Sequence, residues 1–287
     1  MFKMLVAFPG GKDKALTMSY DDGVDTDMRL IEWMEKVGAK CTFNLNSGLF
    51  AAETAVRAED QVHFRLPKSR VATLYRHPLC EVATHGSIHP FYHKLPTSSI
   101  LCDILDDRRA LEELFGRIIR GHAYPYGAFN DTVIEALQQA GIVYARTTRA
   151  HRSFILPQDW LRWDPTCHHN DPQLPELTER FVTQKVGRDE DGWLFYLWGH
   201  TYEFRKDNNW NIMKTFLETV SQGKDIWFAT NIEVYEYLTA WRSLVTSADG
   251  RILYNPTATD VWIKTCERSS NPTETIKIPA GEAVSLG

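Results

Sequence analysis

The chain has 287 residues, of which 43% are hydrophobic and 24% are charged, as is typical of a soluble globular protein. Its formal net charge of -5 argues against binding to nucleic acid or to an anionic membrane surface. The apolar stretches are too short to span a bilayer and the N-terminus lacks a signal-peptide pattern, so we expect a cytoplasmic protein with no membrane partner. The five cysteines are widely spaced and odd in number, which argues against a disulfide framework.

Segments with strand and helix patterns alternate over most of the chain. Strand patterns occur at residues 15–20, 39–46, 80–85, 122–127, 142–146, 193–200 and 225–230. Helical spacing of apolar residues occurs at 25–37, 96–119, 130–140, 211–220 and 231–244, the last with Asn231 as its expected cap. Residues 52–76 have no clear pattern. This alternation predicts an α/β fold with a largely parallel sheet, either doubly wound or closed as a barrel.

The pattern changes near residue 245. Residues 251–256, 260–265 and 275–281 alternate apolar and polar side chains and are separated by Asn, Pro and Gly turns. We therefore expect two parts, an α/β domain at residues 1–244 and a small antiparallel β appendage at residues 245–287.

Polar residues with catalytic chemistry stand where several predicted strands end. Asp21 and Asp22 end the first strand, and His85 and His89 follow the third at a spacing of four. Two imidazoles at this spacing reach one ion, and two histidines with one carboxylate are a common catalytic metal site. Of two adjacent carboxylates, one can bind the metal while the other stays free as a base. The alternative for the histidine pair alone is a surface or capping role.

His200 ends the very apolar strand at 193–200. On its own it is more typical of a core histidine that bonds a backbone carbonyl. Beside a metal and a free carboxylate it becomes a candidate general acid, since histidine titrates near neutral pH.

Four motifs together resemble one family. "SYDDG", "THGSIH", "YPYG" and "LWGH" occur in the order and approximate spacing of the NodB-like polysaccharide deacetylases, carbohydrate esterase family 4. The resemblance covers residues 16–244. It implies a distorted (β/α) barrel of seven or eight strands, followed here by the β appendage. It also implies hydrolysis of an N- or O-acetyl group on a sugar or polysaccharide.

The resemblance also implies catalytic roles by position. Asp21 would be the base that activates water, and His200 would protonate the leaving amine or alkoxide. The main-chain N–H of Tyr126 would stabilise the oxyanion that develops on the acetyl group.

The implied cofactor is one divalent transition metal ion. By position, its ligands would be Asp22, His85 and His89. Two imidazoles and a carboxylate suit zinc best, and they also accept cobalt, nickel, iron or manganese.

Two departures from the family pattern concern residues that assist the base and the acid. The family has an arginine where this chain has Ala123, and Arg146 at the end of the next strand is the candidate replacement. The motif that tunes the acid is not clearly present. Asp164 or His168, in "RWDPTCHHND", are the candidates for orienting His200.

Two other functions remain open from the sequence. One is a cofactor-independent hydrolase of cyclic amides, since the expected barrel also resembles that of the allantoinases. The other is an inactive carbohydrate-binding relative, which the missing arginine at Ala123 suggests. A complete set of candidate ligands, base and acid argues against both, because neither needs all of them.

Overall fold

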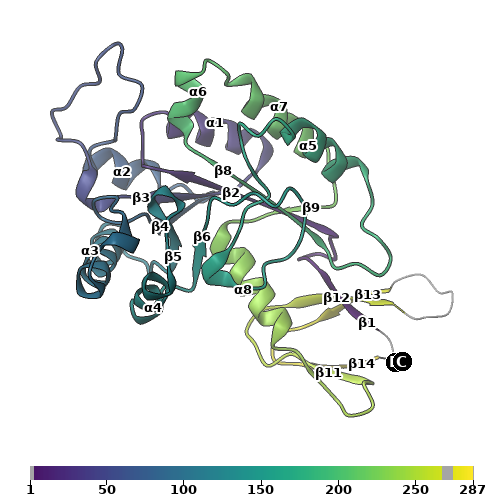
Figure 1. Ribbon diagram of the computed structural model, residues 1–287. Helices are drawn as coiled ribbons and strands as arrows, with labels where there is room; N and C mark the ends of the chain where they lie inside the picture. The colour runs from purple at the N-terminus through teal and green to yellow at the C-terminus, as the bar shows by residue number, and fades with distance from the viewer. Residues whose placement is uncertain (1–2, 267–273, 287) are drawn as a thin grey trace.

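A parallel sheet forms the centre of the protein (Figure 1). The computed structural model describes residues 3–266 and 274–286. The strands of this sheet follow the order β6-β5-β4-β3-β2-β8-β7, and β9 also pairs with β2. They are β2 (Lys14–Asp21), β3 (Cys41–Leu45), β4 (Cys80–Thr84), β5 (Gly121–Ala123), β6 (Tyr144–Arg146), β7 (Cys167–His168), β8 (Trp193–Gly199) and β9 (Ile226–Phe228).

Strand β2 runs through the middle of the core. All eight of its residues are buried. It pairs with β8 along one edge, and its other edge pairs with β9 near its start and with β3 near its end. Its polar residues are buried as well and are hydrogen-bonded: the Thr17 hydroxyl donates to Asn231, and the Ser19 hydroxyl accepts from Asn44. The carboxyl end of β2, at Asp21, therefore lies among the ends of its parallel neighbours.

Helices lie outside the sheet (Figure 1). Helices α1, α5, α6 and α7 gather on one side, and α3 and α4 pack together on another. The helices are α1 (Asp27–Val37), α2 (Lys68–Leu74), α3 (Thr97–Phe115), α4 (Asp131–Gln139), α5 (Leu174–Thr183), α6 (Thr201–Lys206), α7 (Asn211–Val220) and α8 (Asn231–Arg242). The predicted α/β class and distorted parallel barrel are confirmed.

Several local details differ from expectation. The segment 52–76, which has no clear pattern, contains the short helix α2. The cap of α8 is Thr230, which forms a capping box with Glu233, so the assignment of Asn231 was wrong. The side chain of Asn231 is turned inward instead, where its Nδ2 donates to the Tyr196 hydroxyl. Strand β7 and helices α5 and α6 were not predicted, because they are short or separated by polar turns.

The C-terminal residues form two small antiparallel sheets, as expected. One has the order β1-β12-β13 and the other β10-β11-β14. Their strands are β1 (Lys3–Ala7), β10 (Val245–Thr246), β11 (Ile252–Tyr254), β12 (Val261–Cys266), β13 (Glu274–Ile278) and β14 (Ala283–Ser285). Strand β1 thus comes from the N-terminus and pairs with the C-terminal segment. The division at residue 245 stays a prediction.

Helix α8 packs between the parallel sheet and the C-terminal sheets. The Tyr237 hydroxyl donates to the carbonyl of Ala7 in β1 and accepts from the N–H of Trp262 in β12 at 3.0 Å. Ala240 packs with Leu253 and other buried residues of the small sheets. These contacts attach the small sheets to the barrel.

Two further expectations concern cysteines and membrane spans. Cys41, Cys80 and Cys167 are buried free thiols, and Cys102 is an exposed one. Within the described ranges, none of the helices combines the length and apolar character needed to cross a bilayer.

Candidate active site

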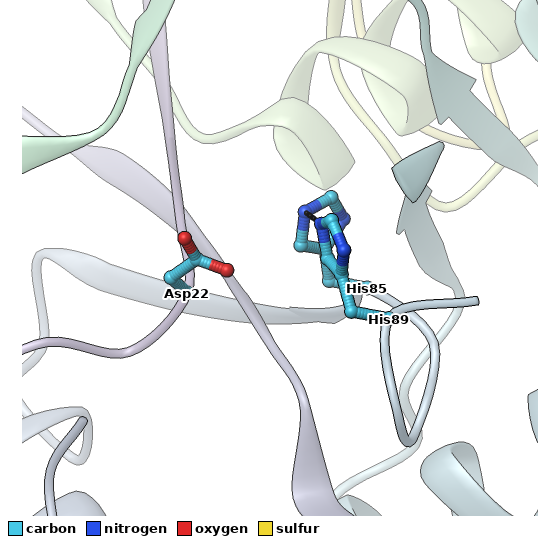
Figure 2. A group of neighbouring side chains, drawn as sticks. All are labelled: Asp22, His85 and His89. Carbon is cyan, nitrogen blue, oxygen red and sulfur yellow. Dashed lines mark hydrogen bonds between the residues drawn. The ribbon is translucent and has the colours of Figure 1, made fainter. Parts of the chain in front are cut away.

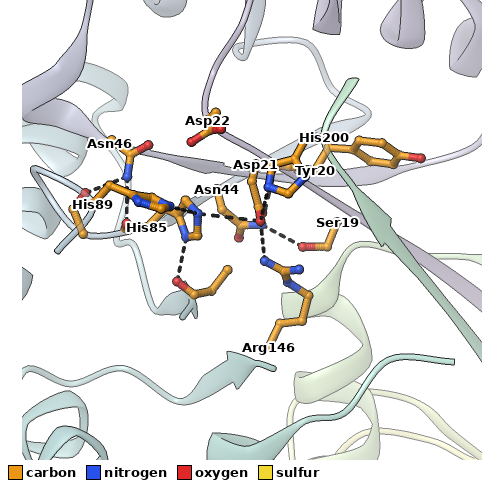
Figure 3. Close-up of polar contacts among 12 residues, drawn as sticks. Ser19, Tyr20, Asp21, Asp22, Asn44, Asn46, His85, His89, Arg146 and His200 are labelled. Atoms are coloured by element: carbon orange, nitrogen blue, oxygen red, sulfur yellow. Dashed lines mark hydrogen bonds and ion pairs between the residues drawn. The ribbon is translucent and has the colours of Figure 1, made fainter. Parts of the chain in front are cut away.

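The candidate catalytic residues meet where neighbouring parallel strands end (Figure 3). Asp21 is the last residue of β2, His85 follows β4, and His200 follows β8. The carboxyl ends of parallel strands share one edge of the sheet, so these residues approach one another despite their distance in sequence. The carboxylate of Asp21 and the imidazole of His85 are almost fully buried. His200 remains 20% exposed.

Asp21 is surrounded by cationic and donor groups. Its Oδ2 lies 2.5 Å from Nη2 of Arg146, and Asn44 donates to its Oδ1 at 2.7 Å. The Nε2 atoms of His85 and His200 lie 3.6 and 3.7 Å from Oδ2. Burial raises the pKa of Asp21, but the charges of Arg146 and the two imidazoles outweigh burial and lower the pKa overall. Asp21 is therefore held as a carboxylate.

Arg146 reaches Asp21 from the strand next to Ala123. Ala123 in β5 and Arg146 in β6 are register partners, so both stand at the same level of the sheet. The Arg146 side chain is 1% exposed, and its guanidinium also stacks on the ring of Trp198 at 4.3 Å. The structure thus brings an arginine to Asp21, the candidate base, from the neighbouring strand.

Asp22, His85 and His89 form a group with the spacing of a metal site (Figure 2). One ligand atom from each residue lies within 4.8 Å of the other two. The Nδ1 of His85 lies 2.8 Å from the carbonyl of Ala123, and a carbonyl only accepts, so the proton is on Nδ1. The lone pair is left on Nε2, which lies 3.2 Å from Nε2 of His89. This donor set fits a divalent metal.

The protonation of this group suits a metal. Burial lowers the pKa of His85, and burial together with the neighbouring His85 lowers the pKa of His89 to about 4. Both imidazoles are therefore neutral at neutral pH. Burial raises the pKa of Asp22, but its contacts with His63, His85 and Arg65 lower the pKa overall. A carboxylate and two neutral imidazoles are the forms that bind metals.

Three residues around this group have left-handed backbone conformations. The φ angles are 84° at Asp22, 54° at His89 and 58° at Tyr126. Such conformations are rare for residues with a side chain and cluster at functional sites, where the surrounding structure holds them. Their gathering around one point marks this edge of the sheet as a site.

Tyr126 lies next to the candidate ligand His89. Their rings are 4.3 Å apart in an edge-to-face arrangement, and the other side of Tyr126 stacks on Phe91 at 3.7 Å. Tyr126 is 56% exposed and Phe91 42% exposed. The turn continues through Gly127 at φ 64°, where a Cβ atom would lie 2.2 Å from Oγ1 of Thr148. Glycine is therefore required next to Tyr126.

His200 is adjacent to Glu203, which the sequence analysis missed. Nδ1 of His200 lies 3.4 Å from Oε1 of Glu203, three residues further on in α6. Burial lowers the pKa of His200, but contacts with Glu203 and Asp21 raise it above the ordinary value overall. The spacing i, i+3 at the start of a helix is the signal that identifies Glu203. Thus Nδ1 of His200 faces the carboxylate of Glu203, and its Nε2 faces the carboxylate of Asp21.

His168 and His169 reach the same carboxylate. Their Nε2 atoms each lie 3.1 Å from Oε2 of Glu203. His168, Glu203 and His200 also have metal-like spacing, but Nδ1 of His168 accepts a hydrogen bond from the N–H of Asn170 at 3.1 Å. The proton of His168 is therefore on Nε2, where it faces Glu203 and leaves no lone pair for a metal. This group fits proton handling and not metal binding.

The two residues expected to orient His200 have different positions. His168 lies near it, with ring centroids 6.3 Å apart, and contacts it through Glu203. Asp164 accepts a hydrogen bond from the Thr147 hydroxyl and pairs with Arg149 at 3.6 Å. The structure therefore brings Glu203, and not Asp164, against the acid candidate.

Asp22 has two partners that the sequence analysis also missed. Arg65 donates to its Oδ1 at 2.9 Å, and Nε2 of His63 lies 3.1 Å from its Oδ2. Both come from the segment between η1 (Ser47–Leu49) and α2, whose sequence has no periodicity to place it. Only the folded chain brings this segment to the site.

The fold is shared with a solved carbohydrate esterase domain. Among solved structures, the Xyl-CE4 domain of a multidomain xylanase from the hindgut metagenome of Trinervitermes trinervoides matches with 17% identity and a TM-score of 0.52, over 79% of this chain and 92% of that one. At this identity the match shows the fold alone, the distorted barrel of family 4 carbohydrate esterases.

Two other structures match with lower TM-scores. A deacetylase from Streptococcus pyogenes in complex with acetate has 19% identity over 46% of this chain, with a TM-score of 0.40. A family 4 pseudoenzyme from Bacillus anthracis has 17% identity over 79% of this chain, with a TM-score of 0.48. The chain spans 55% and 66% of their lengths, respectively.

A family model matches part of the sequence. Residues 9–145 match the family model for polysaccharide deacetylases, a range that includes Asp21, Asp22, His85, His89 and Tyr126. The matched range, just under half of the chain, is thus similar to the polysaccharide deacetylases. His200 and Glu203 lie outside the matched range. No protein of curated function matches the chain.

Proposed function

We propose that the protein is a metal-dependent hydrolase that removes an N- or O-acetyl group from a sugar or polysaccharide. The observation that carries this proposal is the position of Asp21. Its Oδ2 lies 3.6 Å from His85 of the candidate metal site and 3.7 Å from the candidate acid His200. A base, an acid and a metal site within reach of one point are what acyl transfer to water requires.

Asp22, His85 and His89 would hold the metal, with zinc as the first candidate. A divalent metal at this place supplies polarisation of the acetyl carbonyl and a lower pKa for the attacking water. The proton on Nδ1 of His85, fixed by the carbonyl of Ala123, keeps its Nε2 lone pair directed at the site.

The protein's own residues would move the protons. Asp21, kept ionised by Arg146, accepts the proton of the attacking water. His200, kept protonated by Glu203, donates a proton to the leaving nitrogen or oxygen. The main-chain N–H of Tyr126 donates a hydrogen bond to the carbonyl oxygen as negative charge develops there. Base and acid are thus different residues, each with its own partner.

The exposed aromatic pair supports a sugar as the substrate. Phe91 and Tyr126 leave large ring surfaces at solvent beside His89, and Lys94 lies over the Phe91 ring at 4.8 Å. Aromatic surface flanked by hydrogen-bond donors suits a sugar, which has apolar C–H faces and hydroxyl edges. A small cyclic amide would leave this surface uncovered.

The experiment is an acetate-release assay after metal removal and reloading. The substrates are N-acetylglucosamine oligomers, acetylated xylan and allantoin. We expect acetate release from at least one acetylated carbohydrate, abolished by chelation and restored by zinc or cobalt. Hydrolysis of allantoin by the chelated protein would favour the cyclic-amide alternative. No turnover of any substrate, with metal bound, would favour the inactive carbohydrate-binding alternative.

We propose a cytoplasmic location as well, which the odd number and wide spacing of the cysteines support. Fractionation of the producing cells, with an antibody against the protein, tests it. Recovery outside the cytoplasm would contradict this proposal and leave the chemistry of the site unaffected.

A further inference from the structure

Arg65 holds Asp22 at two points. Its Nη2 donates to Oδ1 of the carboxylate at 2.9 Å, and its Nη1 donates to the main-chain carbonyl of the same residue at 3.0 Å. The Arg65 side chain is only 18% exposed. A guanidinium is planar and rigid, so it can fix the side chain and the backbone of one residue together.

The second contact bears on the unusual backbone of Asp22. A φ of 84° is strained for a residue with a side chain and persists only where the surrounding structure holds it. The N–H of Asp22 bonds to the carbonyl of Asn44 at 3.0 Å, and Arg65 binds the carbonyl on the other side. Arg65 therefore supplies one of two restraints that keep this conformation.

Asn46 extends the contact to the next candidate ligand. Nη1 of Arg65 also donates to Oδ1 of Asn46. The Nδ2 of Asn46 donates to the carbonyls of His85 and Gly86, each at 2.7 Å, and Asn46 is buried. One chain of hydrogen bonds thus joins Asp22 after β2 to His85 after β4 (Figure 3 shows the Asn46 part). It fixes the distance between two of the three candidate ligands.

His63 contacts the same carboxylate differently. It makes a single contact, from Nε2 to Oδ2 at 3.1 Å, and its ring is 35% exposed. A metal ion that binds one oxygen of Asp22 must break the contact which that oxygen already makes. The single contact of His63 to Oδ2 is easier to break than the contact of Arg65 to Oδ1. The two oxygens of Asp22 are not equivalent.

We infer that Arg65, through Asn46, is a positioning residue for the metal site. It binds Oδ1 and the main chain of Asp22, so that Oδ2 is directed to the ion shared with His85 and His89. The inference rests on the proposed function, because it assumes that these three residues bind the metal. Loss of such a partner to a metal ligand typically lowers metal affinity about 10–100-fold.

The test measures metal affinity directly. Zinc and cobalt dissociation constants are obtained by competition with a chromophoric chelator, and the visible spectrum of the cobalt form reports ligand geometry. We expect Arg65→Ala to weaken binding about 10–100-fold and to alter the cobalt spectrum. Arg65→Lys keeps the positive charge but not the planar pair of N–H donors, so we expect its metal affinity to lie between those of Arg65→Ala and the wild type.

Two variants serve as matched controls. His63→Ala removes the other side-chain contact to Asp22, and we expect unchanged or tighter binding. Arg57→Ala lies in the same segment but pairs with Asp25 at 3.6 Å, and we expect no change. If Arg65→Ala does not fold, as judged by circular dichroism, Asn46→Ala and Arg65→Lys carry the test with the same expected direction.

The outcomes separate the two claims. Wild-type affinity and spectrum in the arginine variants would overturn the role of Arg65 and leave the proposed metal site standing. If His63→Ala weakened metal binding as much as Arg65→Ala, the role of Arg65 would also be overturned, because any contact to Asp22 would then have the same effect. No metal binding by the wild type, or unchanged binding by Asp22→Ala, would overturn the metal site and this inference together.

Discussion

Two groups of histidines lie on either side of Asp21 and differ in how their protons are placed. Each combines two imidazoles and a carboxylate within 4.8 Å. In the first group a backbone carbonyl accepts from Nδ1 of His85, so Nε2 has a free lone pair. In the second a backbone N–H donates to Nδ1 of His168, so Nε2 carries the proton. Residue types alone therefore do not distinguish a metal site from a proton-handling site.

The difference arises from single backbone groups. Ala123 offers its carbonyl because β5 runs beside β4, and Asn170 offers its N–H because the chain turns after β7. A main-chain carbonyl or N–H has only one possible role in a hydrogen bond, so each assigns the tautomer of its histidine. The comparison leads to four expected results.

The largest contrast is between His85→Ala and His168→Ala. We expect His85→Ala to lose the metal and all activity, because it removes a ligand. His168→Ala should keep one metal per chain, since His168 contacts Glu203 and is not one of the three candidate ligands. Metal content by plasma mass spectrometry checks both. Metal loss in His168→Ala would show that the second group also binds metal and would break the comparison.

Asp21→Asn tests the residue between the two groups. An amide cannot accept the proton of water, so we expect the rate to fall about 10²–10⁴-fold while the metal remains bound. Steady-state acetate release and metal content are measured together, with the exposed Asp60→Asn as control. Loss of metal in Asp21→Asn would instead make Asp21 a ligand.

Arg146→Met tests what holds Asp21. The ion pair is buried, with side-chain exposures of 1% and 2%, so the variant leaves an unpaired buried carboxylate. We expect the free energy of unfolding to fall by about 3–5 kcal/mol, as measured by urea denaturation. Because the two residues interact, the loss in Asp21→Asn with Arg146→Met should be smaller than the sum of the single losses. If the two losses in the free energy of unfolding are additive, the ion pair between Asp21 and Arg146 contributes little to stability.

Glu203→Gln should give the smallest effect of the four, a shift in the pH profile. It tests whether the group of His168, His200 and Glu203 handles a proton. Glu203 raises the pKa of His200, and an acid catalyst is active below its pKa, while it is protonated. Removing the charge lowers this pKa, so the alkaline fall in kcat/KM should move to lower pH with little change at its acidic side. The exposed Glu176→Gln is the control. An unshifted profile would mean that Glu203 does not tune the acid.

The strand ends were predictable, and so were the residues standing on them. The run from Ala15 to Tyr20 is apolar because β2 is buried on both faces, and this placed Asp21 and Asp22 at the edge of the sheet. The spacing of four then indicated His85 and His89, and the resemblance to the polysaccharide deacetylases added Tyr126. Arg146 was a candidate because it ends the strand beside Ala123, which it pairs with in register.

The partners of these residues were harder to predict. Arg65 and His63 come from a segment without periodicity, and their position is fixed by tertiary contacts such as the bond from the N–H of Asp25 to the carbonyl of Phe64. Asp164 is close to His168 in sequence, but its carboxylate is directed to Thr147. Closeness in sequence does not predict which side chains are in contact where short turns determine the direction of each side chain.

The pairing of β1 with β12 has a consequence for how the chain folds. Lys3 is paired with Cys266 and Ala7 with Trp262, so the two strands of this pair are separated by most of the described chain. Contacts between distant parts of a chain form slowly, because a long loop must close before they contribute any stability. The barrel can begin to assemble during synthesis, whereas β1 cannot form its strand pairing with β12 until residues 261–266 have been made. A circular permutant that joins β1 directly to β12 would remove this delay.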